Sequence, residues 1–154
     1  MDKTNEERNE DFIEWTTFTE DRFNDWVKPN PKLAKLLDWS PNSLIIVENY
    51  LLENFTIEDL ENQENKTPID AIVSYVAETI RKNIPETIWK IDLEDKTNIY
   101  YRLPYLVFKL GAPTCPHDLI KDCVGKREHG MIKSRFDYHN KKWIQYQDYL
   151  KTNE

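Results

Sequence analysis

Apolar residues recur every three to five positions along the N-terminal part of the chain, a spacing typical of amphipathic helices that bury one face. An aromatic series predicts one helix over residues 11–27, and the two prolines that follow end it. Leu33–Leu37 can add a short helical turn. Ser40 and Pro41 then favour a helix that continues to about Asn54, because serine caps a helix N-terminus and proline fits the first helical position.

Four later segments show the same helical pattern. Thr56 opens a capping motif for a short helix, and the polar residues 61–66 predict a loop after it. Thr67 and Pro68 begin the clearest helix, whose apolar face recurs at steps of three and four residues until Pro85 ends it. Another helix is predicted from Cys115-Pro116 to near Gly125, and a last one from a heptad-like series: Ile132, Phe136, His139, Trp143, Tyr146 and Leu150.

Between residues 87 and 110 the pattern alternates with period two, which predicts strands. We expect a hairpin that pairs 87–93 with 98–103, and a third strand at 105–110 on an edge, because Pro104 cannot donate to a sheet. Helices on both sides of one run of strands favour an α+β fold. The prediction is four to five helices packed on one small antiparallel sheet with its strands within 87–110.

The length of 154 residues indicates one domain. Residues 1–9 are polar and charged, and we expect them to be disordered or a frayed helix start, followed by a single α+β domain over 10–154. The first ten residues lack the apolar stretch of a signal peptide, and no apolar run approaches the ~20 residues that cross a bilayer. Two cysteines are too few for a disulfide framework. These features predict a cytoplasmic protein without a membrane partner.

Charge is unevenly distributed along the chain. The net charge is −7, and residues 1–70 carry 7 basic against 17 acidic side chains, whereas residues 71–154 carry 14 against 11. Nucleic acid is therefore an unfavourable partner, because phosphate binding needs a basic surface. An acidic half suits a basic protein partner, although it also simply keeps a protein soluble. The sequence leaves the oligomeric state open.

The chain offers few candidates for catalysis. Three glycines exclude a glycine-rich phosphate loop or dinucleotide turn, so we predict no cofactor. Cys115, His117, Cys123 and His129 are the one group of soft ligands, but their spacing fits no standard zinc motif. Cys115 at a helix N-terminus could be a nucleophile with a histidine base; the alternative is a pair of core thiols and a histidine at a helix start.

Clustered carboxylates form the second catalytic alternative, since glycosidic or metal-assisted hydrolysis needs two converging carboxyl groups. Asp92, Glu94 and Asp95 lie at the predicted turn, where solvated acids are also common. Glu78 lies near the apolar face of its helix, three residues before Arg81, where the two can pair locally.

Six residues of the predicted hairpin make the best binding surface. Tyrosine and arginine are frequent interface anchors, and carboxylates steer a basic partner. The candidate partner-binding residues are Asp92, Glu94, Asp95, Tyr100, Tyr101 and Arg102. Glu58, Asp59, Glu61 and Glu64 form a competing acidic segment that has fewer aromatic residues.

One series of features resembles a known kind of protein. Tyr75-Val76-Ala77-Glu78-Thr79-Ile80-Arg81 precedes Trp89 on a predicted strand and then Tyr100-Tyr101-Arg102-Leu103-Pro104. The order is similar to that of small bacterial proteins in which a helix carrying Tyr-x-Gly-Glu-x-x-Arg precedes a tryptophan-bearing strand and a hairpin. Ala77 replaces their glycine. Several of those proteins resemble immunity proteins of toxin systems.

The leading prediction is therefore a non-enzymatic, cytoplasmic protein-binding module, an immunity protein that neutralises a toxin. The alternative is a small hydrolase or metal-dependent enzyme that uses Cys115 and His117 or the clustered carboxylates.

Overall fold

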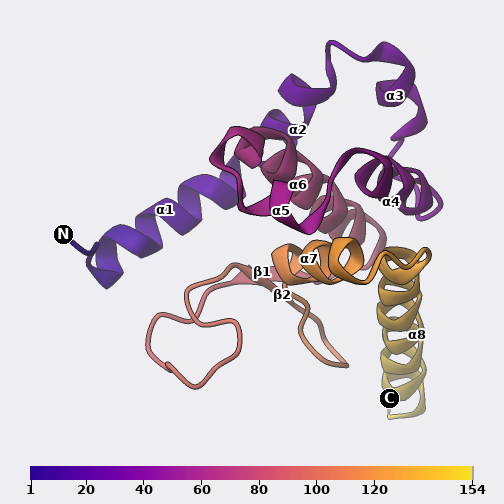
Figure 1. The fold of residues 1–154 in the computed structure, drawn as a ribbon. Coiled ribbons are helices and arrows are strands. Elements are labelled where there is room, and N and C mark those ends of the chain that lie inside the picture. Colours follow the sequence, from indigo (N-terminus) through magenta and orange to yellow (C-terminus); the bar gives the residue numbers. More distant parts are fainter. Residues whose placement is uncertain (154) are drawn as a thin grey trace.

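Helix α6 (Lys66–Asn83) is the centre of the computed structural model, which describes residues 1–153 (Figure 1). Every residue of α6 from Ala71 to Ile80 is buried, because other helices cover it on several sides. The elements that pack on it are α2 (Thr19–Val27), α4 (Ser43–Asn54) and α7 (Pro116–Lys126). The expectation that this segment forms the clearest helix is confirmed, although it begins slightly before Thr67.

The other elements surround this centre. The remaining helices are α1 (Asn5–Thr17), α3 (Pro31–Leu36), α5 (Ile57–Glu61), the single-turn 3₁₀ helix η1 (Gln63–Asn65) and α8 (Met131–Thr152). Strands β1 (Ile88–Lys90) and β2 (Tyr105–Val107) pair antiparallel, with Trp89 opposite Leu106. The α+β class is confirmed. The count of four to five helices is wrong, because residues 1–153 form eight α-helices.

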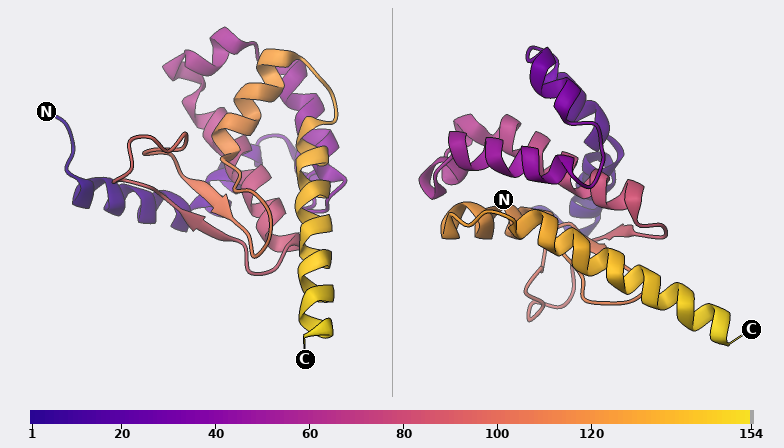
Figure 2. Two further views of the ribbon diagram at one scale, coloured as in Figure 1. Left: turned by 90° about the horizontal axis from the view of Figure 1, so that it is seen from below. Right: turned by 90° about the vertical axis from the view of Figure 1, so that its right-hand side faces the viewer.

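The predicted helix over 11–27 is divided at Phe18 into α1 and α2. Just before the break, the hydroxyls of Thr16 and Thr17 donate to the carbonyls of Phe12 and Ile13, at 2.9 and 2.6 Å. Hydroxyl groups that bond to a carbonyl one turn back bend helices. The break sends α2 onto α6 and directs α1 away from it, toward the sheet (Figure 2).

A capping motif marks the start of α1 near the N-terminus. Thr4 accepts a hydrogen bond from the Glu7 amide at 3.1 Å, and the Glu7 carboxylate accepts one from the Thr4 amide at 2.9 Å. This reciprocal capping box satisfies two amides that a helix start leaves free. Helix α1 begins at Asn5, so residues 5–9 form a helix start, which is one of the two alternatives that the sequence left open for residues 1–9.

The predicted antiparallel pairing of 87–93 with 98–103 is wrong, because only one isolated parallel bridge, between Asp92 and Tyr101, joins the two segments. Residues 98–103 turn on themselves: the Tyr101 amide donates to Asn98 O at 2.9 Å, and the Leu103 amide donates to Tyr100 O at 2.8 Å. Arg102 has a left-handed backbone, with φ +65°. Amides committed to local turns cannot form a ladder, so β1 pairs with the later strand β2.

Helix α8 buries only its first half. Ile132, Phe136 and His139 are buried, whereas Leu150, on the same heptad face, is 46% exposed. Figure 2 shows the C-terminal half of α8 extending beyond the other elements. Among the helices of residues 1–153, none combines the length and apolar character needed to cross a membrane.

Candidate functional site

The residues between the two strands, 91–104, form an ordered loop that we call the 91–104 loop. The Asp92 carboxylate organises it by accepting hydrogen bonds from the amides of Asp95 and Glu94 and from the Asn98 side chain, each at 2.9 Å. These bonds, that of Asp95 foremost, hold the pKa of Asp92 below its ordinary value. Asp92 therefore shapes the loop from within.

The 91–104 loop is also attached to α1. Asn5 Nδ2 donates to Leu93 O at 3.1 Å and to Glu94 Oε1 at 3.3 Å. Beyond this attachment the loop projects into solvent, and Ile99 is 80% exposed. The loop thus combines a defined conformation with a large apolar side chain that the fold leaves uncovered.

The six predicted site residues share this loop but not one face. Glu94, Asp95 and Arg102 are exposed, whereas Asp92 accepts the loop's own hydrogen bonds. Tyr100 is half-buried, its ring centroid lies 5.7 Å from that of Tyr105, and burial is the main cause that raises its pKa. Tyr101 is half-buried beneath the Arg102 guanidinium, which lies 4.9 Å from its ring centroid.

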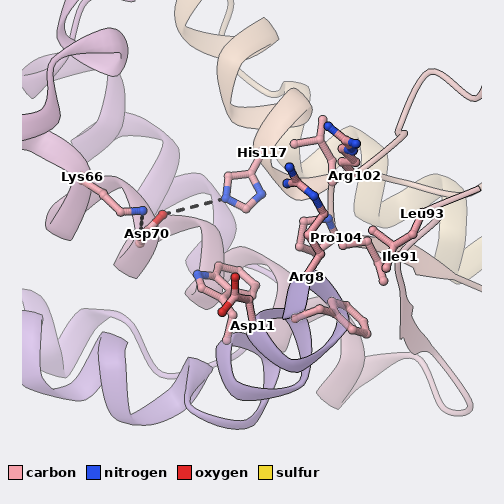
Figure 3. Close-up of a pocket in the computed structure, with 12 residues that line it drawn as sticks. Arg8, Asp11, Lys66, Asp70, Ile91, Leu93, Arg102, Pro104 and His117 are labelled. Atoms are coloured by element: carbon pink, nitrogen blue, oxygen red, sulfur yellow. Dashed lines mark ion pairs between the residues drawn. The ribbon is translucent and has the colours of Figure 1, made fainter. Parts of the chain in front are cut away.

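A cleft of about 260 Å³ lies where the 91–104 loop faces α1, near the starts of α6 and α7 (Figure 3). We call it the α1–loop cleft. Its apolar walls come from both sides of the gap: Phe12, Trp15, Ile91, Leu93, Leu103 and Pro104. The break in the predicted 11–27 helix aims the first part of the aromatic series at this cleft, while Phe23 points into the core.

The Asp70 carboxylate lies at this cleft beside two basic side chains. Its carboxylate lies 3.4 Å from Lys66 Nζ and 3.9 Å from His117 Nε2. Burial alone would raise the pKa of Asp70, but His117 and Lys66 together outweigh it and bring that pKa below its ordinary value. The His117 ring also packs against Trp15, with 5.4 Å between centroids. Asp70 thus lies between a lysine and a histidine.

The cysteines and histidines find separate partners. Burial, above all, raises the pKa of Cys115 to about 11 and that of Cys123 to about 12, so both thiols are protonated at neutral pH. His129 Nδ1 lies 3.1 Å from Asn49 Oδ1, and His117 faces Asp70. Within residues 1–153, no three or more His, Cys, Asp or Glu side chains are grouped to hold a metal ion. The geometry gives the nucleophile alternative no support.

Glu78 has a larger role than the predicted local pair with Arg81. Its buried carboxylate accepts two hydrogen bonds from Arg81 Nη1, at 2.9 and 3.0 Å. It also accepts one from Thr19 Oγ1 at 2.9 Å and one from Trp89 Nε1 at 3.1 Å. One side chain thereby joins α2, α6 and β1. In the sequence, the position of Glu78 near an apolar helix face was the feature that indicated a buried carboxylate with several partners.

Glu48, which the sequence analysis missed, caps a helix from a distance. Its carboxylate accepts hydrogen bonds from the amides of Gly130, at 2.5 Å, and Ile132, at 3.0 Å, and contacts Cys123 Sγ at 3.5 Å. Gly130 stands at the N-cap of α8 and has no side chain of its own to do this. In the sequence, a long predicted helix that follows Gly130 has no capping side chain of its own, and this indicates that a distant residue must cap it.

Comparison with known proteins yields no relatives. No family model matches the chain, and no curated protein and no solved structure is detectably similar to it.

Proposed function

We propose that the chain is a non-enzymatic, cytoplasmic protein-binding module, an immunity protein that neutralises a basic toxin through the 91–104 loop. The resemblance of residues 75–104 to immunity-type proteins and the net charge of −7 support this reading. Charge complementarity speeds and orients the encounter of two proteins.

The observation that carries the proposal is Ile99 on its ordered loop. Ile99 is 80% exposed and therefore offers a large apolar side chain that a partner can cover, and the loop that carries it is already held by Asp92 and Asn5. A surface with a fixed conformation loses little entropy when it binds, which raises affinity. Ile99 is thus the anchor.

Exposed acidic side chains lie on the same loop as Ile99 and on the neighbouring helix α1. Glu94 and Asp95 are exposed on the same loop, and Glu94 contacts Asn5 at the start of α1. The exposed acids Glu6 and Glu10 continue the negative charge along α1. Exposed carboxylates on the same loop as an exposed apolar residue suit a partner that combines lysines and arginines with an apolar pocket.

The test is a growth assay in which the chain is co-expressed with the toxin encoded beside its gene. We expect the chain to restore growth and to bind the purified toxin in calorimetry. Ile99→Asp and Glu94→Lys should each weaken binding by about tenfold or more. Glu58→Lys on α5 is the matched charge reversal outside the loop and should leave affinity unchanged.

Two results would overturn the proposal. If no toxin gene adjoins the gene, or the chain neither binds nor protects, the immunity function is wrong. If Glu58→Lys abolishes binding while Glu94→Lys and Ile99→Asp leave it intact, the 91–104 loop is not the binding surface.

A further inference from the structure

Two arginines enter the α1–loop cleft from opposite sides. Arg8 comes from α1 and Arg102 from the 91–104 loop, and both line the cavity. In Figure 3 the two side chains reach into the same space, with His117 beside them. Like charges repel, so two arginines that line one cavity are unfavourable unless an anion offsets their charge.

Neither arginine has a close counter-charge among residues 1–153. Arg8 has one ion-pair contact, to Asp2 at 3.9 Å, and Asp2 is 94% exposed. Arg102 has no ion pair with the described residues and lies only over the Tyr101 ring. The acids of the cleft are already engaged, since Asp11 Oδ2 lies 2.5 Å from Lys3 Nζ and Asp70 faces Lys66 and His117.

Two buried nitrogens at the cleft also lack partners within the described chain: Arg8 Nε and His117 Nδ1. Buried polar groups are almost always hydrogen-bonded in folded proteins. Arg8 Nε is always a donor, so it lacks an acceptor here, whereas His117 Nδ1 can donate or accept, depending on the tautomer. An anionic oxygen would satisfy a guanidinium nitrogen and neutralise its charge together.

Arg127 is a comparison for Arg102, because its guanidinium finds hydrogen-bond acceptors within the chain. Arg102 and Arg127 both have left-handed backbones, with φ +65° and +54°. Arg127 ends α7, and its guanidinium donates to the carbonyls of Phe55, at 2.7 Å, and Leu52. The Arg102 guanidinium donates to no acceptor within residues 1–153, although its backbone carries the same strain. Strained residues tend to collect at ligand sites.

We propose that the α1–loop cleft binds a carboxylate that carries an apolar body. The carboxylate would lie between Arg8 and Arg102, which match its geometry better than a lysine does. The apolar body would lie against Phe12, Trp15 and Pro104. A cavity of about 260 Å³ is slightly smaller than most ligand sites, so it suits a group no larger than one amino acid. The proposal does not rest on the immunity function, although the site shares Arg102 with the 91–104 loop.

The ligand can be a free acid or the C-terminal residue of a peptide, and calorimetric titration of the full chain distinguishes the two. The probes are 4-phenylbutyrate and an acetylated peptide that ends in phenylalanine, each paired with its neutral amide. We expect one or both acids to bind and the matching amide to bind about tenfold more weakly or not at all. Whichever acid binds more tightly identifies the source.

Three variants test the residues. Arg8→Gln and Arg102→Gln keep most of the side chain and should each weaken binding of the acid by about tenfold or more. Lys141→Gln removes one exposed positive charge from α8 and should leave it unchanged. Thermal melting checks that each variant folds, and Arg102, on an exposed loop, provides the test if Arg8→Gln fails to fold.

The proposal is wrong if the unaltered chain binds neither acid at millimolar concentration, or if acid and amide bind equally. It is also wrong if both arginine variants bind as well as the unaltered chain. Inorganic phosphate that binds more tightly than either acid would assign the cleft to a simple anion instead.

Discussion

Glu78 and Asp92 are two carboxylates that each accept several hydrogen bonds, but their partners lie at different distances along the chain. Glu78 is buried, and its donors come from Thr19 and Trp89, 59 and 11 residues away, as well as from Arg81. Asp92 takes its donors from residues two to six positions ahead. The first carboxylate holds elements together, and the second shapes one loop.

The comparison extends to the regions around them. In the interior, each buried glutamate is surrounded by donors of the chain itself, as Glu48 also shows. At the α1–loop cleft, Arg8 and Arg102 have no such close partners among residues 1–153. Charged groups that are hydrogen-bonded within the chain stabilise the fold, and charged groups without such partners are available to bind a ligand.

The largest expected effect on the free energy of unfolding comes from the buried carboxylate, Glu78. Glu78→Ala should lower the free energy of unfolding by about 3 kcal/mol, because it leaves Arg81 and two further donors without their acceptor in a mostly buried site. Urea unfolding measures the loss. Glu64→Ala, an exposed acid on η1, is the control and should change stability little. A loss below about 1 kcal/mol for Glu78→Ala would contradict its structural role.

A second effect of similar size concerns His139. Burial, with a smaller contribution from Arg135, lowers the pKa of His139 from 6.5 to about 4. Since the unfolded chain binds the proton more tightly, the neutral form stabilises the fold above pH 6.5, and that stability is lost as the pH falls toward 4. The loss at pH 4 should be about 3 kcal/mol.

The variant His139→Gln isolates this contribution, because all other titrating groups remain. Its stability should fall less between pH 7 and pH 4 than that of the unaltered chain, measured by urea unfolding at each pH. Equal slopes for the two proteins would show that His139 does not titrate with a lowered pKa.

The smallest effect on stability belongs to Asp92. Asp92→Ala should leave the melting temperature nearly unchanged while the amides of Glu94 and Asp95 exchange with solvent about tenfold faster, because their acceptor is gone. Hydrogen exchange followed by NMR measures this. Asp92→Asn keeps one oxygen acceptor and should retain most of the protection.

In the unaltered chain, lowering the pH below the ordinary pKa of aspartate should loosen the loop, since the carboxylate form accepts these bonds. A clear fall in melting temperature for Asp92→Ala would remove the distinction between the two carboxylates.

Local signals in the sequence predicted two of the helix starts correctly, whereas α4 begins at Ser43 and not at Ser40-Pro41, and α6 has Asn65 and not Thr67 at its N-cap. The capping box of Thr56 and Asp59 forms at the start of α5, and Pro116 stands in the first turn of α7. Pro85 follows directly after α6 and its C-cap. These signals succeed because a cap or a proline acts on residues within one turn of itself, so no distant partner is needed.

Signals of the same kind failed where two local preferences competed. The alternation over 98–103 favours a strand, but Asn98 and the left-handed Arg102 favour turns, and the turns prevailed. Likewise, the heptad series of α8 predicts one apolar face without indicating that neighbours cover only its first half. Periodicity describes an element and not what lies against it.

The sequence by itself determined the α+β class, the positions of two helix starts and the charge imbalance, because each depends on composition or on residues a few positions apart. Only the tertiary structure decided that Glu48 caps α8 and that Glu78 joins α2 to β1. It alone brought Arg8 to the same cleft as Arg102. Such contacts arise when distant segments pack, and a hydrogen bond across 80 residues leaves no spacing in the chain from which it can be predicted.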